Sequence, residues 1–209
     1  MHILIFGDSI TYGAWDGEGG WANRLRNFFD RMQMEKRLDY CLTYNLGISG
    51  DTTRDVLKRF ESETKRRFED EKEFTIIFSI GSNDSEIINK TNATLVSEKE
   101  FTKNVDTLIK KAKKLSKNVV FTGLLNVDET RTVPIPWMTT RSYKNDTIKK
   151  YDSIISSECK RNKIHFIEMF GKIREEFLFD GVHPNSMGHE KIFSAMKEYL
   201  IKNNIIVMK

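Results

Sequence analysis

Cysteine and proline are scarce in this sequence, and it has no long hydrophobic run. The two cysteines among the 209 residues, Cys41 and Cys159, lie far apart, which excludes a disulfide scaffold and a cysteine-based metal motif. Free thiols suit a reducing compartment. No apolar stretch is long enough to span a membrane, and the short one at residues 3–6 lacks the basic leader of a signal peptide. We therefore expect a cytoplasmic protein with no membrane partner.

An excess of one charge sign is also absent, since 34 Lys and Arg face 30 Asp and Glu for a net charge of +4. A nucleic-acid surface would need clustered, uncompensated basic residues. The lysines between residues 110 and 117 fall mostly opposite the apolar face of a predicted helix, as on a solvated surface. We expect no nucleic-acid partner. Without a linker or repeat, residues 1–209 are predicted to form a single domain, and whether it forms a homo-oligomer is left open.

Short apolar runs alternate with longer amphipathic ones along the chain. The predicted strands, rich in Ile, Val and Phe, cover residues 2–6, 42–46, 75–80, 118–122 and 164–167. The predicted helices cover residues 21–32, 53–68, 98–115, 141–161 and 187–202. Two of them begin with a capping-box pattern, Thr52 with Asp55 and Ser97 with Glu100. This alternation predicts an α/β protein, a five-stranded parallel sheet with helices on both faces in three α/β/α layers.

Polar segments that contain glycine follow the first three predicted strands, and a fourth precedes the last helix. In an open parallel sheet the ligand lies beyond the carboxyl ends of the strands. We therefore expect these four segments to meet at one edge of the sheet. They are Gly7-Asp8-Ser9-Ile10-Thr11, Gly47-Ile48-Ser49-Gly50-Asp51, Gly81-Ser82-Asn83-Asp84 and Asp180-Gly181-Val182-His183-Pro184.

The side chains in these segments match the requirements of acyl transfer. Serine is a weak nucleophile without an adjacent base, which makes Ser9 with His183 a candidate pair. Asp180, three residues before His183, is placed to orient the imidazole. The backbone N–H groups of Ser9 and Gly47 and the amide of Asn83 could donate to an oxyanion. Gly50 is assigned to a tight turn instead.

Four sequence blocks, GDSIT, NLGISG, GSND and DGVHP, resemble the signature blocks of the SGNH hydrolases, the GDSL-like lipases and esterases. The resemblance implies a flavodoxin-like fold, a serine esterase that acts on esters or thioesters, and no cofactor or metal. It implies Ser9 as nucleophile and oxyanion donor, Gly47 and Asn83 as further donors, and Asp180 with His183 as the acid and base. The expected substrate is a small-molecule or carbohydrate ester, with small acyl or acetyl groups favoured.

Three other functions stay open from the sequence. A metal-dependent phosphoesterase would use oxygen and nitrogen ligands at the same sheet edge, but an Asp-x-His pair is missing. The candidate ligands are Asp8, Asp51, Asn83, Asp84, Asp180 and His183. A catalytically silent binding module could share the fold, although it would be expected to lose one of the site residues. Acyl transfer to a sugar hydroxyl would use the same residues as hydrolysis.

The segment 123–140 is long for a connection in such a fold, and long loops often form lids or binding surfaces. It carries Trp137 and Met138 beside two prolines. We interpret these two side chains as candidates for the acyl or alcohol pocket, with the alternative that Trp137 attaches the loop to the body. If Trp137 only attaches the loop, the pocket would lie near Trp15, Trp21 and Gly47.

Overall fold

Five parallel strands form the central sheet of the computed structural model, which describes residues 1–67 and 74–209. The sheet order is β2-β1-β3-β6-β8, the flavodoxin-like arrangement in which the second strand lies outside the first. The predicted fold class is confirmed, and the predicted strand ends differ from the observed ones by at most one residue. The strands are β1 (His2–Gly7), β2 (Leu42–Gly47), β3 (Phe74–Ser79), β6 (Asn118–Thr122) and β8 (His165–Ile167).

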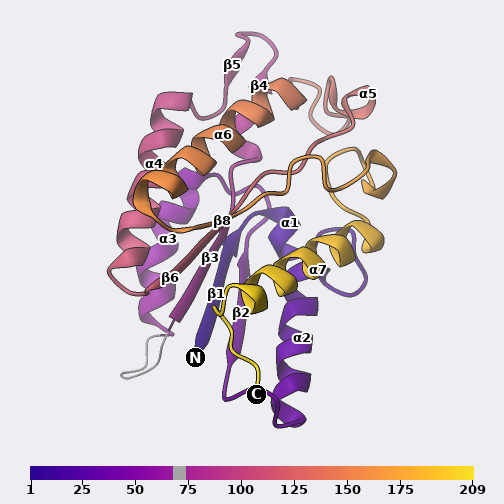
Figure 1. Cartoon of the computed structure of the whole chain (residues 1–209). Coiled ribbons are helices and arrows are strands. Elements are labelled where there is room, and N and C mark those ends of the chain that lie inside the picture. Colours follow the sequence, from indigo (N-terminus) through magenta and orange to yellow (C-terminus); the bar gives the residue numbers. More distant parts are fainter. Residues whose placement is uncertain (68–73) are drawn as a thin grey trace.

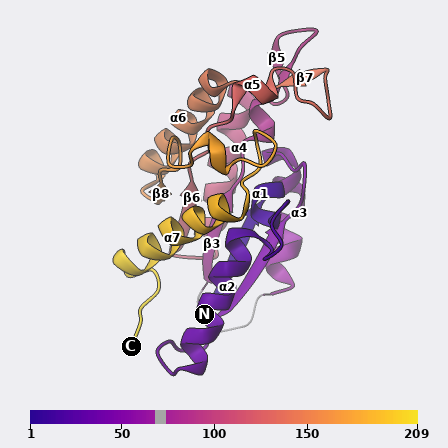
Figure 2. The ribbon, with the colours of Figure 1, turned by 90° about the vertical axis from the view of Figure 1, so that its right-hand side faces the viewer.

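Helices cover both faces of this sheet (Figures 1 and 2). Successive strand residues point to opposite faces. Leu4 therefore packs in one core with α3 (Thr53–Lys65), α4 (Glu98–Lys113) and α6 (Asn145–Asn162). Ile3 packs in the other core, with α2 (Gly20–Met34) and α7 (Ser186–Lys202). Burial on both faces explains why the strands read as continuous apolar runs. Within the described residues, no helix is both long and apolar enough to cross a membrane.

The two helices with a predicted capping box, α3 and α4, begin where the sequence predicted. The Ser97 hydroxyl accepts a hydrogen bond from the Glu100 N–H at 3.3 Å at the start of α4. At the start of α3, the Thr52 N–H donates to the Asp55 carboxylate at 3.1 Å. Each contact gives a partner to a backbone N–H group that the hydrogen bonds of the helix itself leave unpaired. The predicted end of α3 near residue 68 lies outside the described residues.

A second, three-stranded antiparallel sheet was not predicted. Its order is β5 (Ala93–Thr94), β4 (Ile87–Ile88) and β7 (Arg141–Ser142). Strand β7 occupies the residues where the predicted fourth helix was to begin, and α6 therefore starts at Asn145. This small sheet joins the segment after β3 to the segment after β6, above the carboxyl ends of the central strands (Figure 1).

Candidate active site

Ser9 lies where the chain turns from β1 into the short helix α1 (Ser9–Tyr12). The Asp8 carboxylate caps this helix by accepting from the Ile10 N–H at 3.0 Å. Burial raises the pKa of the Asp8 carboxyl to about 6. As the first residue of α1, Ser9 has a backbone N–H without a partner inside the helix, which leaves it available to a ligand. The helix cap therefore sets both the hydroxyl and the N–H of Ser9 at the sheet edge.

The structure brings Ser9, His183 and Asp180 into one hydrogen-bonded chain. The Ser9 Oγ lies 2.8 Å from Nε2 of His183, although the two residues are 174 positions apart. The other ring nitrogen, Nδ1, lies 2.7 Å from Oδ2 of Asp180. Because a carboxylate only accepts, Nδ1 carries the hydrogen and Nε2 is the acceptor for the Ser9 hydroxyl.

Asp180 is itself held by the backbone of its own turn. Its Oδ1 accepts from the N–H groups of Val182 at 3.0 Å and His183 at 2.8 Å. Burial alone would raise the pKa of the Asp180 carboxyl, but the hydrogen bonds from the ring and the backbone of His183 outweigh it and leave the pKa below its usual range. Asp180 therefore stays ionised and keeps the imidazole in one orientation.

Asn83 reaches the same place from the short helix after β3, η1 (Asn83–Ser85). Its Nδ2 donates to the Asp51 carbonyl at 2.8 Å, and its Oδ1 accepts from the Tyr143 hydroxyl at 2.7 Å. These two bonds distinguish the oxygen from the nitrogen of the amide. One hydrogen of Nδ2 has no partner within residues 1–67 and 74–209.

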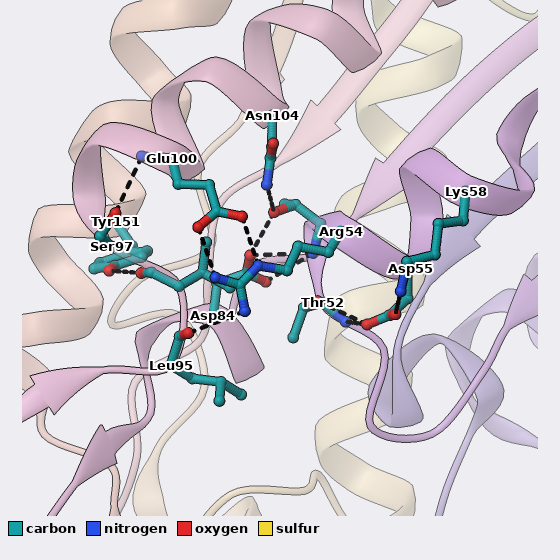
Figure 3. Close-up of polar contacts among 12 residues, drawn as sticks. Thr52, Arg54, Asp55, Lys58, Asp84, Leu95, Ser97, Glu100, Asn104 and Tyr151 are labelled. Carbon is teal, nitrogen blue, oxygen red and sulfur yellow. Dashed lines mark hydrogen bonds and ion pairs between the residues drawn. The ribbon is translucent and has the colours of Figure 1, made fainter.

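A polar network joins Asp84, the residue after Asn83, to the first turns of α3 and α4 (Figure 3). The buried Asp84 carboxylate accepts from the Thr53 N–H at 3.0 Å and from its hydroxyl, at the first residue of α3. Asn104 of α4 donates to the same hydroxyl at 3.0 Å. Burial raises the pKa of the Asp84 carboxyl to about 7. Arg54 and Glu100 join α3 to α4 beside it with two charged hydrogen bonds. Asp84, a candidate metal ligand from the sequence, thus braces the turn through these hydrogen bonds.

The backbone N–H of Gly47 has a partner within its own strand. Its N–H donates to the Asn45 side chain at 3.0 Å and is already engaged. A Cβ at Gly47 would stand 2.3 Å from the Tyr12 backbone nitrogen, which means that glycine here permits the close approach of β2 to α1. Gly50 lines the cleft beside Ser9 instead, with a φ of +83°. Within the described residues its N–H has no hydrogen-bond partner. The N–H that the sequence predicted as an oxyanion donor at Gly47 thus has a partner, and the N–H at Gly50 has none within the described residues.

A cleft of about 510 Å³ opens at Ser9 and His183. Trp137 and Met138, the pocket candidates from the sequence, both line it, and the Trp137 ring lies 5.8 Å from the His183 ring. Trp15 also lines the cleft, 6.3 Å from the His183 ring. Trp21, an alternative pocket candidate, does not line this cleft and is completely buried in the same core as α7.

Three polar residues of the cleft were not found by sequence reasoning. Glu86, Arg141 and Tyr143 line the cleft, and Arg141 forms an ion pair with Glu86. They belong to no motif block. The only sequence signal is that Glu86 follows Asn83 by three positions.

The candidate metal ligands are mostly engaged with other protein groups. Asp51 pairs with Arg59 at 2.8 Å, while Asp8 and Asp84 bind helix starts. Within the described part of the chain, no group of three His, Cys, Asp or Glu side chains is arranged to hold a metal ion.

Comparison with known proteins gives one family and a set of similar folds. Residues 5–191 match the GDSL-like lipase/acylhydrolase family. The lipase/acylhydrolase from Enterococcus faecalis is 21% identical, with a TM-score of 0.79 over 100% of this chain and 98% of that chain. An acetylxylan esterase from Geobacillus stearothermophilus is 19% identical, with a TM-score of 0.70 over 93% of this chain and 91% of that chain. Structures of that esterase include catalytic mutants at a serine, an aspartate and a histidine.

An alpha/beta hydrolase from the metagenome of Lake Arreo, Spain, is 20% identical, with a TM-score of 0.69 over 93% of this chain and 92% of that chain. No curated protein matches. The structural likenesses establish the shared fold, and the family match covers most of the sequence. The chain therefore belongs to the GDSL-like lipase/acylhydrolase family.

Proposed function

We propose that this protein is a serine esterase that hydrolyses carboxylic esters or thioesters through an acyl-enzyme on Ser9. The observation that carries the proposal is the chain from Ser9 through His183 to Asp180, with contacts of 2.8 and 2.7 Å. A hydroxyl, a base and an orienting carboxylate in this order form the arrangement that activates serine for attack on a carbonyl.

In the first half of the reaction, Nε2 of His183 accepts the Ser9 proton while Oγ attacks the carbonyl carbon. The carbonyl electrons move to its oxygen and form a tetrahedral oxyanion. Collapse of this intermediate breaks the bond to the leaving alcohol or thiol, which takes the proton from His183. In the second half, water gives a proton to His183, attacks the acyl carbon and releases the acid, and His183 returns the proton to Ser9.

The oxyanion needs donors aimed at it before the reaction begins. We assign this role to the backbone N–H of Ser9, the free Nδ2 hydrogen of Asn83 and the N–H of Gly50. Gly50 replaces Gly47 in this set because the Gly47 N–H is bonded to Asn45. The Gly50 backbone borders the cleft, and a residue without a side chain allows the substrate to approach it closely.

We propose small acyl or acetyl groups as the preferred substrates, on a small-molecule or carbohydrate alcohol. The Glu86–Arg141 ion pair forms part of the cleft wall, and a long alkyl chain packed there would desolvate both charges. The similar fold of an acetylxylan esterase agrees with a short acyl group. We further propose that residues 1–209 form one domain. We also propose a cytoplasmic location, because the two free, buried thiols suit a reducing compartment.

A fluorophosphonate probe tests the nucleophile directly. We expect it to label Ser9 alone, and Ser9→Ala should abolish labelling and lower kcat by several orders of magnitude. Ser49→Ala is the matched control, because Ser49 is an exposed serine that lines the same cleft. Labelling that persists in Ser9→Ala would refute the assignment.

Assays on the same wild-type protein distinguish the esterase from the other candidate functions. We expect activity on p-nitrophenyl acetate to be insensitive to EDTA. Loss of activity with EDTA and recovery with a divalent cation would favour the phosphoesterase. Binding without turnover of p-nitrophenyl esters, acetylated sugars or acyl-thioesters would favour the silent module. An acetylated sugar formed when free xylose is added would indicate acyl transfer.

A further inference from the structure

Tyr143 lies against the candidate oxyanion donor because of the small antiparallel sheet. In this sheet Ile87 pairs with Ser142. One step further along the same register, Glu86 and Tyr143 come to face one another. The Tyr143 side chain is 3% exposed, and its hydroxyl lies 2.7 Å from Oδ1 of Asn83 and 2.8 Å from Oε1 of Glu86.

The Asn83 amide would be free to rotate about its terminal torsion without partners at both ends, because that torsion is broad in energy. The Asp51 carbonyl accepts one Nδ2 hydrogen at 2.8 Å, and the Tyr143 hydroxyl occupies Oδ1. A flipped amide would place Oδ1 against the Asp51 carbonyl and Nδ2 against a hydroxyl that already serves as donor. Loss of the tyrosine contact removes one of these two restraints.

The Tyr143 hydroxyl has one hydrogen and two acceptor oxygens next to it, on Asn83 and Glu86. Arg141 binds the other oxygen of Glu86 and weakens this carboxylate as an acceptor. The hydrogen lies between these two acceptors, of which Oδ1 of Asn83 is the nearer, at 2.7 Å against 2.8 Å. Burial and the Glu86 charge raise the pKa of the Tyr143 phenol well above its ordinary value, and it remains a donor over the working range of pH.

We propose that Tyr143 is a positioning residue for catalysis, which holds the Asn83 amide so that its second Nδ2 hydrogen is aimed at the oxyanion, and that Arg141 supports it through Glu86. The proposal rests on the proposed esterase function. The proposal goes beyond that function because it assigns a role to three cleft residues outside the four sequence blocks.

The main variant is Tyr143→Phe, which removes only the hydroxyl. We expect kcat on p-nitrophenyl acetate to fall at least tenfold but less than for loss of the whole Asn83 amide, with KM changed less than twofold. The affinity for an alkyl trifluoromethyl ketone, which forms a tetrahedral oxyanion on serine, should fall by a similar factor. Tyr151→Phe is the control: this buried hydroxyl contacts Thr94 and Val96, outside the cleft. It should lower Tm without changing kcat.

A double-mutant cycle with Asn83→Ala distinguishes positioning from general destabilisation. In the Asn83→Ala background, Tyr143→Phe should have almost no further effect on kcat. Arg141→Met, which keeps the phenol, should also lower kcat in the wild type and lose this effect in Asn83→Ala, and it carries the test if Tyr143→Phe does not fold. Equal factors in both backgrounds, or a kcat unchanged by Tyr143→Phe, would overturn the proposal. Failure of the esterase assignment is recognised separately, by activity that survives Ser9→Ala.

Discussion

At the scale of single residues, the site depends on which hydrogen-bonding groups are engaged and which are free. Gly47 and Gly50 differ by three positions, yet Asn45 occupies the N–H of the first and leaves the second at the cleft. Asn83 uses one amide hydrogen for Asp51 and keeps the other. A free donor in a partly dry cleft stabilises a developing charge more than a solvated one. The candidate chemistry therefore rests on a few unpaired N–H groups.

Asn83→Ala removes one of these donors. We expect kcat to fall on the order of 10²–10³ with little change in KM, because the hydrogen bond strengthens only in the transition state. Steady-state kinetics on p-nitrophenyl acetate measure the effect. Asn162→Ala is the control, since the Asn162 amide also donates to a backbone carbonyl, that of Glu158 at 2.9 Å, but lies at the end of α6, away from the cleft. A loss of Tm without a larger loss of kcat in Asn83→Ala would make Asn83 a structural brace.

Trp137 is the candidate for acyl specificity. Its side chain is 52% exposed and lies 5.8 Å from the His183 ring, which favours contact with substrate over a role in attaching the loop. Trp137→Ala should change the kcat/KM ratio between short and long acyl esters by about 1–3 kcal/mol, the usual worth of lost apolar pocket contacts. A series of p-nitrophenyl esters measures this ratio. Met34→Ala, an 82% exposed side chain on α2, should leave it unchanged. A uniform decrease across the series would assign Trp137 to the loop structure.

At the scale of elements, helix starts and strand ends place the site. Helix α1 begins at Ser9, α3 begins next to the Asp84 brace, and α7 begins shortly after His183. Each start has a polar side chain that accepts from a free N–H, as Asn185 does for Gly188 at 3.1 Å. The small sheet adds a direct contact between the segments that follow β3 and β6.

The cap of α4 provides a test at this scale. Ser97→Ala removes the acceptor for the Glu100 N–H, and we expect the free energy of unfolding to fall by about 1 kcal/mol. Urea denaturation measures it, and Ser97→Asp should retain most of the stability because aspartate also accepts. Activity should change less than twofold in both variants. No loss of stability in Ser97→Ala would mean that water replaces the cap.

At the scale of the whole molecule, polar contacts link α2 and α7 on one face of the sheet. Arg24 of α2 is paired with Asp16 and also donates to Ser186 at 2.8 Å. His189 of α7, which is completely buried, accepts from the Trp21 N–H at 3.3 Å. These contacts join the loop that carries Trp15 to the helix that follows His183. Stability of this face should therefore depend on the charge state of His189.

Burial lowers the pKa of the His189 imidazole to about 4 in the folded protein, against 6.5 for an ordinary histidine. Between these values the unfolded chain binds a proton that the folded chain does not, and the free energy of unfolding falls as the pH falls from about 6.5 to about 4. The full effect is on the order of 3 kcal/mol. Raised pKa values of Asp8 and Asp84 act in the opposite direction, which makes a comparison with a variant necessary.

Urea unfolding at pH 7 and pH 4.5, in wild type and His189→Gln, isolates this contribution. The wild type should lose more stability than the variant between the two values, and the His189 ring signals in NMR should show no protonation at pH 5. Equal losses in the two proteins would contradict the assignment.

Much of this architecture can be predicted from local sequence. The five central strands are apolar runs because both faces of the sheet are buried, and the helix starts at Thr53 and Glu98 follow from capping residues one position earlier. The four polar segments could be expected at one sheet edge, because carboxyl ends of parallel strands meet there. Ser9, Asn83, Asp180 and His183 are found by this rule together with the family resemblance.

Only the tertiary structure decided the remainder. The small sheet has strands of two residues, too short for any periodic pattern, and the pairing of Ile87 with Ser142 joins segments 55 positions apart. Tyr143 reaches Asn83 through that pairing and has no motif of its own. Whether Gly47 or Gly50 offers a free N–H depends on where the Asn45 side chain turns in the folded chain. Local sequence sets strand and helix propensity, whereas long-range contacts determine which donors stay free.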